Sequence, residues 1–345
     1  MSRRNSRDPL YSMLVRFKFT TIALITLLFF LLVISSGVDL GSDGVALAER
    51  TNVRILRLTH RFDITGFENS KFNQPSDVEI TRDRIYVLDG VNDRIAVFDK
   101  KGTPLFTFGK SGSDPGELNS PLGFAIDSKN RIYVADSGNH RIEVFDINGV
   151  FLSNIPLIKD KYGIPSDPTC IAINEQLGYL IIADNDNHRL LIYTVDGKFK
   201  REVGEVGYLE GQFRYPFGID CDSDGNIYVV DVVNTRVQVF DPQGLKVLRV
   251  IGEWGIERGQ YFRPQGIDLD AQNRVYVTES FKNIGVIQVF NPDGSFRAVL
   301  GNRTGEKIRF DVPVDIEIDD ENTSIYICEM YASKISVYQL LDSQK

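Results

Sequence analysis

The sequence predicts an all-β fold, a six-bladed β-propeller, and three observations lead to this prediction. A phrase that starts with proline recurs six times, at Pro75, Pro121, Pro168, Pro216, Pro264 and Pro313. Successive copies lie 46 to 49 residues apart, and each of the first five contains four short apolar segments separated by turns. Four short strands at this period describe one propeller blade. Because the apolar residues alternate with a period of two, helical repeats are excluded.

Each copy contains its strands in a fixed order. In the second copy, "PLGFAID" is the first strand, "IYVAD" the second and "RIEVFD" the third, and in the fourth copy "KVLRVIG" is a fourth strand. In the first four copies the second strand ends in aspartate, at Asp89, Asp136, Asp184 and Asp231, and the third starts with arginine, at Arg94, Arg141, Arg189 and Arg236. We expect a charge-assisted hydrogen bond to close each of these turns. His140 and His188 share one position of the turn, so we expect them to be repeat residues.

The two ends of the repeat region predict how the ring closes. The sixth copy ends at Leu340, after its third strand, so its fourth strand must come from elsewhere. Residues 53–58 (VRILRL) resemble a fourth strand such as "LKVLRV". We expect these residues to complete the sixth blade, to cover Ile335 and Val337, and to remove an open sheet edge.

The combined pattern, P-x-G-[IF]-x-[IVL]-D followed by N-x-[YV]-V-x-D-x-x-N-x-R-[IV]-x-V-F, resembles the NHL repeat over residues 53–340. The fifth copy departs from it, because it has about two extra residues between Ser280 and Val286 and lacks the arginine. The sixth has Ala332 and Lys334 where Asn and Arg are usual. The resemblance implies a six-bladed propeller.

Two kinds of catalytic site are missing from the sequence. Amidating lyases share NHL-type propellers and use a histidine zinc site, but the three histidines here, His60, His140 and His188, are not expected around one centre. The sequence also has no G-x-S-x-G nucleophile elbow and no glycine-rich phosphate loop. We therefore name no catalytic residue.

The N-terminal residues 1–48 are expected to form a segment separate from the propeller of residues 49–345. The chain carries no charge between Lys18 and Asp39, and this apolar run is long enough to cross a bilayer as a helix. Basic residues precede it, which favours a cytoplasmic N-terminus and an extracytoplasmic body. Two interpretations remain open: a signal peptide cleaved after the small-residue site "ALA" at residues 46–48, or an uncleaved signal anchor.

Charge and cysteine content limit the partners. The formal net charge is −8 and no basic stripe is present, which argues against a nucleic-acid partner. Cys170, Cys221 and Cys328 are odd in number and lie in apolar runs, so we expect buried free thiols rather than a disulfide.

Acidic residues replace small ones on the first strands, which line the channel of a propeller. They are Asp77, Glu79, Asp220, Asp268, Asp315 and Glu317. Since the sixth and first blades are neighbours in a closed ring, four of these carboxylates should lie side by side. Crowded carboxylates indicate either an acidic channel with raised pKa values or a cation site, and oxygen ligands suit Ca²⁺ or Mg²⁺.

Long loops that join one blade to the next form one rim with the Asp–Arg turns. Two of them, "GEVGYLEGQFRYP" and "GEWGIERGQYFRP", are rich in aromatic residues, and residues 152–168 form the longest irregular connection. We expect Phe213 and Phe262 to belong to the core. Tyr215, Trp254 and Tyr261 are the candidates for contact with a partner, because Trp and Tyr are favoured anchors in interfaces.

These observations favour a monomeric, exported or membrane-anchored module that binds a protein or ligand through its loop-rich face. Fold alone does not decide this, since propellers include binders and enzymes. The alternative is a divalent-metal-dependent lyase or lactonase that uses the channel carboxylates.

Overall fold

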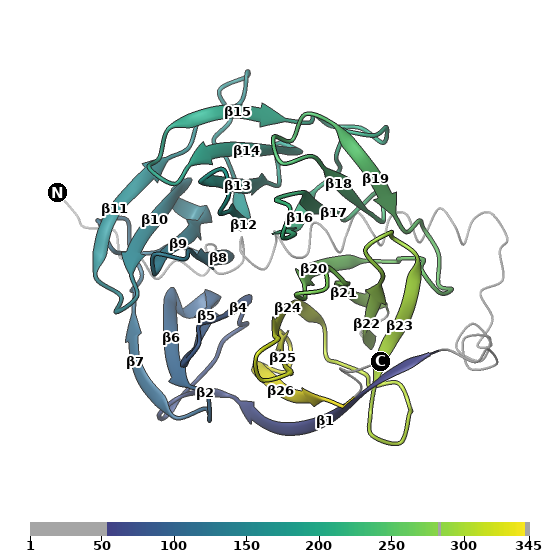
Figure 1. Ribbon diagram of the computed structural model, residues 1–345. Helices are drawn as coiled ribbons and strands as arrows, with labels where there is room; N and C mark the ends of the chain where they lie inside the picture. Colours follow the sequence, from purple (N-terminus) through teal and green to yellow (C-terminus); the bar gives the residue numbers. More distant parts are fainter. Residues whose placement is uncertain (1–53, 282–283, 342–345) are drawn as a thin grey trace, which may run out of the picture. The chain divides into compact units, whose positions relative to one another are not determined.

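The computed structural model describes residues 54–281 and 284–341, which lie within one compact unit, Val53–Lys345. Its blades are arranged around a centre, as the repeat predicts (Figure 1). Four blades are separate four-stranded sheets, and the other two belong to one eight-stranded sheet. The prediction of an all-β propeller is confirmed.

Each of the first three blades has four strands that follow one another in the sequence. Blade 1 consists of β4 (Asp77–Ile80), β5 (Arg84–Asp89), β6 (Arg94–Asp99) and β7 (Pro104–Phe108). Blade 2 consists of β8 (Gly123–Ile126), β9 (Arg131–Asp136), β10 (Arg141–Asp146) and β11 (Phe151–Pro156). Blade 3 consists of β12 (Pro168–Asn174), β13 (Tyr179–Asp184), β14 (Arg189–Thr194) and β15 (Phe199–Val203).

The other three blades continue this order except for the last strand of blade 6. Blade 4 consists of β16 (Pro216–Cys221), β17 (Ile227–Asp231), β18 (Arg236–Phe240) and β19 (Val247–Ile251). Blade 5 consists of β20 (Pro264–Leu269), β21 (Val275–Phe281), β22 (Ile284–Phe290) and β23 (Phe296–Gly301). Blade 6 consists of β24 (Pro313–Asp319), β25 (Ser324–Glu329), β26 (Lys334–Leu340) and β1 (Ile55–Ile64). A small hairpin, β2 (Gly66–Phe67) and β3 (Ser70–Lys71), and two 3-10 turns, η1 (Gly90–Asn92) and η2 (Ser137–Asn139), complete the elements of the described residues.

The first strand of every blade lies next to the centre and contacts the first strand of the next blade, including β24 against β4 (Figure 1). The hydrophobic core lies between neighbouring blades rather than in the channel. Between blades 1 and 2, for example, Tyr86 and Phe108 pack with Phe124 and Phe145. The sheets therefore fix the relative positions of their first strands, and with them the channel.

The Asp–Arg pairs that the repeat predicts are present in the first four blades. The Nε atoms of Arg94, Arg141, Arg189 and Arg236 lie 2.8 or 2.9 Å from the carboxylates of Asp89, Asp136, Asp184 and Asp231. In blades 2 and 4 the arginine does more than close its turn. Arg236 also donates from Nη2 to the backbone oxygens of Leu209 and Gln212 in the preceding long loop, and Arg141 holds its own loop in the same way. The pair is thus architectural, and it also fixes the loops of the rim.

Strand β1 completes blade 6, and the prediction that the N-terminal strand closes the ring is confirmed. The expected bounds, residues 53–58, were wrong, because most of the pairing with blade 6 is made by residues 58–64. Leu58 pairs with Leu340 and Ile64 with Ile335 in antiparallel β26, and the strand continues past a bulge between His60 and Phe62. Residues 55–57 pair instead with β23 of blade 5, in parallel. One strand therefore joins the last two blades.

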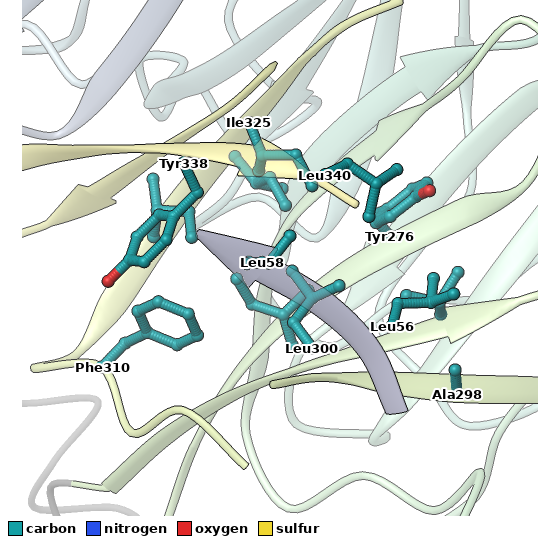
Figure 2. Packing of buried hydrophobic residues seen from close by; sticks show 13 residues of the cluster. Leu56, Leu58, Tyr276, Ala298, Leu300, Phe310, Ile325, Tyr338 and Leu340 are labelled. Carbon is teal, nitrogen blue, oxygen red and sulfur yellow. The ribbon is translucent and has the colours of Figure 1, made fainter. Parts of the chain in front are cut away.

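The side chains of β1 that face inward belong to a shared core (Figure 2). Leu56 and Leu58 are 1% and 2% exposed and lie among Leu300 of blade 5 and Tyr338 and Leu340 of blade 6 (Figure 2). The alternation of these leucines with the exposed Arg57 is the pattern expected of a strand with one buried face. The ring closure is thus stabilised by apolar burial as well as by backbone pairing.

Two further expectations concern the N-terminus and the cysteines. Residues 1–53 lie outside the described part, and none of the helices found within that part is long and apolar enough to cross a membrane. The three cysteines are free, as expected. Cys328 is buried as expected, whereas Cys170 and Cys221 are half-buried.

Candidate functional site

The centre of the ring holds a cavity of about 220 Å³ between the first strands. Its lining includes all six carboxylates that the sequence places on the channel: Asp77, Glu79, Asp220, Asp268, Asp315 and Glu317. Aliphatic residues such as Ala125, Ala172 and Ile173 line the side formed by blades 2 and 3. The six channel carboxylates therefore lie on one side of the cavity, and the side of blades 2 and 3 is mostly apolar but includes Glu175, which accepts hydrogen bonds from Ser128.

Four of the six carboxylates bind the backbone of a neighbouring blade. Asp315 accepts a hydrogen bond from the N–H of Val78 in blade 1 (3.0 Å), and Asp77 accepts one from Phe124 in blade 2 (2.7 Å). Asp220 accepts from Leu269 in blade 5 (2.9 Å) and Asp268 accepts from Ile318 in blade 6 (2.6 Å). These aspartates connect five of the six blades around the channel, a role that the sequence analysis did not predict.

The same four aspartates form two carboxyl–carboxylate pairs, Asp77 with Asp315 and Asp220 with Asp268. Such a pair shares one proton, because two adjacent negative charges repel each other. Burial, the largest cause, raises the pKa of Asp77 to about 7 and that of Asp220 to about 6. It also raises the pKa values of Asp268 and Asp315, for which the charge of the paired or neighbouring carboxylate is a further cause. The direction of these shifts agrees with the raised pKa values that an acidic channel predicts.

Glu79 and Glu317 differ from these aspartates. Burial and the neighbouring carboxylates raise the pKa of both, and no hydrogen bond contributes to either shift. Among the described residues, no three His, Cys, Asp or Glu side chains come together as a metal ion requires. The geometry therefore favours the acidic channel, and the Ca²⁺ or Mg²⁺ site stays a prediction.

The long loops expose large apolar side chains on two neighbouring connections, residues 204–215 and 252–263. Trp254, predicted as a contact residue, is 62% exposed, and Tyr208, which the sequence analysis did not single out, is 76% exposed. Val206, Leu209 and Ile256 are also exposed on these loops. These five residues are called the apolar rim below.

The assignment of Tyr261 to the contact surface was wrong. Its side chain is fully buried, with its ring centroid 5.5 Å from that of Phe290. Gly252, at φ 76°, makes room for this ring, since a Cβ there would lie 2.2 Å from it. Phe213 occupies the equivalent position against Gly204 and is buried as expected, whereas Phe262 is half-buried. Matching "GQF" with "GQY" would have identified Tyr261 as the core residue.

Tyr215 is half-buried and packs against His188, with ring centroids 4.5 Å apart. The backbone N–H of Tyr215 donates to Nδ1 of His188 (3.1 Å). His140, in the same position one blade earlier, contacts the backbone oxygen of Ser166 through Nδ1 (2.7 Å). Both histidines thus join neighbouring blades, and Tyr215 contributes to this joint more than to the surface.

Hydrogen bonds hold the two aromatic loops in one conformation. Gln212 accepts from the N–H of Leu209 and donates to Glu205, and Gln260 makes the same two contacts with Glu257 and Glu253. From the third strand, buried Gln238 binds the N–H of Gly211 and the oxygen of Gln212, and Gln288 does the same for the second loop. The apolar rim is therefore presented by rigid loops.

Comparison with known proteins agrees with this architecture. A family model described as a 6-bladed β-propeller matches residues 67–161, and the NHL repeat model matches residues 166–193. Both matches support the resemblance to NHL-repeat β-propeller proteins that the sequence predicts.

Individual relatives resemble only part of the chain or only its fold. A stretch of 43 residues is 46% identical to the B-box type zinc finger protein ncl-1 of Caenorhabditis elegans, and it covers 12% of this chain but 5% of that protein. A catalytically inactive virginiamycin B lyase from Staphylococcus aureus, solved with quinupristin, is 17% identical with a TM-score of 0.56, over 79% of this chain and 83% of the lyase. A structure described as a gluconolactonase candidate is 12% identical with a TM-score of 0.59, over 83% of this chain and 92% of that one. At these identities the structures show a shared fold.

Proposed function

We propose that the protein is an exported or membrane-anchored propeller that binds a partner, most simply another protein, through its loop-rich face. The observation that carries this proposal is the apolar rim. Trp254 and Tyr208 are largely exposed, yet the loops beneath them are held by buried Gln288 and Gln238. Exposed aromatic side chains on a rigid support lose little conformational freedom on binding, and such residues dominate the energetics of interfaces.

The rest of the proposal comes from the sequence. The apolar run before the propeller supports export or anchoring, with the N-terminus in the cytoplasm and the propeller outside it. The net charge of −8 argues against nucleic acid as the partner. The propeller acts as a monomer, and a propeller fold by itself does not distinguish a binding module from an enzyme.

Replacing the two aromatic residues of the rim tests the binding face. The propeller beginning at residue 49 is immobilised and compared with its Trp254→Ala/Tyr208→Ala variant. We expect the variant to retain its partner about tenfold less well or worse, since truncating an aromatic anchor costs about 2 kcal/mol or more. Leu245→Ala is the matched control, because Leu245 is 71% exposed but lies in the β18–β19 turn, away from the rim. Equal retention by all three proteins would show that the contact face is elsewhere.

A divalent-metal-dependent lyase or lactonase is the second candidate. Glu79 and Glu317 favour it, because they line the cavity and make no hydrogen bond with any residue that the structure describes. The donor set as a whole does not fit Ca²⁺ or Mg²⁺, which take six or more oxygen ligands, since the four aspartates already accept backbone N–H groups.

Chelation distinguishes the two candidates. We expect the purified propeller to contain no stoichiometric divalent metal by elemental analysis, and its melting temperature to be the same with and without EDTA. A bound cation that stabilises the wild-type protein but not the Glu79→Gln/Glu317→Gln variant would instead establish the metal site and favour the enzyme.

A further inference from the structure

Buried polar atoms without a hydrogen-bond partner gather in one part of blade 5. Among the described residues, four of the eight such side-chain atoms lie between Tyr261 and Ser280: Tyr261 Oη, Arg263 Nε, Gln265 Oε1 and Ser280 Oγ. Buried polar groups are normally paired, so a concentration of unpaired ones needs an explanation. Arg263, Gln265 and Ser280 are called the blade-five corner below, whereas the side chain of Tyr261 belongs to the core between blades 4 and 5.

The corner lies where the loop-rich face meets the channel. The backbone N–H of Ser280 donates to the backbone oxygen of Arg263 (3.2 Å), and in the next pair of the register Pro264 lies opposite Glu279. Arg263 precedes Pro264 in the chain and Gln265 follows it, so both lie at the start of β20. Ser280 lies opposite them, near the end of β21. Arg263 also ends the loop that presents Trp254.

Arg263 is a cation without a counter-ion within the described residues. Its guanidinium makes no hydrogen bond or ion pair with the described residues. Burial lowers the pKa of Arg263, and the neighbouring Tyr331 raises it. In the other blades the residue before the first-strand proline is uncharged or acidic: Gln74, Ser120, Asp167, Tyr215 and Val312. The repeat thus has no structural need for a cation at this position. A half-buried, unpaired charge is costly to the folded state unless a ligand compensates it.

We propose that the blade-five corner binds an oxyanion, a carboxylate or phosphate group of a ligand, with Arg263 as the charged donor. The planar guanidinium offers a fork of N–H donors that matches both groups. The hydroxyl of Ser280 adds a donor, and the carboxamide of Gln265 presents either an oxygen or an N–H according to its orientation. Water alone would satisfy the hydroxyl and the amide but would leave the charge of Arg263 uncompensated. The site is independent of the apolar rim, so its test needs no protein partner.

Thermal unfolding of the propeller beginning at residue 49 tests the proposal, with inorganic phosphate and acetate as separate probes and sodium chloride keeping the ionic strength constant. A ligand that binds the folded state raises the melting temperature in a saturable way. We expect a saturable rise for the wild-type protein with at least one probe, and the probe that acts identifies the oxyanion as a phosphate or a carboxylate. We expect no rise for Arg263→Met. Without either probe this variant should melt at the same temperature as the wild type or higher, because an unpaired charge has been removed.

Three further variants keep the test decisive. Arg258→Met removes an exposed arginine of the same loop and should respond like the wild type. If Arg263→Met does not fold, Arg263→Lys and Ser280→Ala replace it, and both should need severalfold more of the active probe for half the effect. The proposal is overturned if neither probe stabilises the wild-type protein beyond the effect of chloride, or if the Arg263 and Ser280 variants respond as the wild type does.

Discussion

A propeller that begins at residue 65, and so lacks strand β1, is expected to aggregate, whereas one that begins at residue 49 is expected to fold. The deletion removes Leu56, Leu58 and Ile64, all at most 4% exposed. At about 1.5–3 kcal/mol for each large apolar side chain, their loss amounts to roughly 5–9 kcal/mol. This is comparable to the whole stability of a domain, about 5–15 kcal/mol. The deletion would also leave β26 with an unpaired edge, which favours aggregation.

Two point variants give the same test within the folded ring. Leu58→Ala should reduce the free energy of unfolding by about 2–5 kcal/mol, the usual range for a buried leucine. Arg61→Ala, in the same strand, should change it little, because the hydrogen bond of Arg61 to Gln339 is exposed. Denaturant unfolding measures both. Cooperative melting of the shortened protein at the wild-type temperature, or equal stability of the two point variants, would contradict the closure by β1.

The second large effect is an unusual dependence of stability on pH. A carboxyl whose pKa is higher in the folded than in the unfolded state stabilises the protein when protonated, and this contribution is lost as pH rises. The unfolded carboxyls ionise near pH 4. Between that value and the raised pKa values of Asp220, about 6, and Asp77, about 7, the stability should therefore fall steadily. We expect the propeller to melt at a clearly higher temperature at pH 5 than at pH 8, by about 2–4 °C for each kcal/mol lost.

Asp315→Asn tests the cause of this dependence. The carboxamide can accept from the N–H of Val78 and donate to Asp77, so the contacts remain while one ionisable group disappears. The variant should be more stable than the wild type at pH 8 and similar to it at pH 5. Asp114→Asn, on an exposed loop, is the matched control and should keep the wild-type profile. A wild-type protein that is more stable at pH 8 than at pH 5 would show that the channel carboxyls do not govern its stability.

The repeat predicted the fold well because every blade contains the same phrase, and each copy supports the others. Even the closing strand was recognisable, because the apolar Leu56 and Leu58 lie on either side of Arg57 in the alternation that is typical of a strand. Its extension to Ile64 was not, because the polar residues His60, Arg61 and Asp63 resemble a loop. The pairing with β26 continues through them only because a bulge restores the inward position for Ile64.

The candidate site was predictable in position and less so in role. Counting along the repeat placed six carboxylates on the channel, and all six line it. Their hydrogen bonds depend on how far one first strand is displaced along the next, which no single copy encodes. That is why the sequence predicted either an acidic channel or a cation site, but not that the aspartates accept hydrogen bonds from backbone N–H groups of the next blade. Tyr261 was misplaced for a simpler reason, since phenylalanine fills the same position one blade earlier.

Strand β1 also determines how the molecule would respond to mechanical load. Any force transmitted along the chain from the residues before Arg54 enters the ring through this strand. Its pairing with β23 and β26 runs along the direction of such a pull, so the load is shared by many hydrogen bonds in shear rather than opening them one at a time. A pull on Arg54 would therefore load the seam between the last two blades before any other part of the ring.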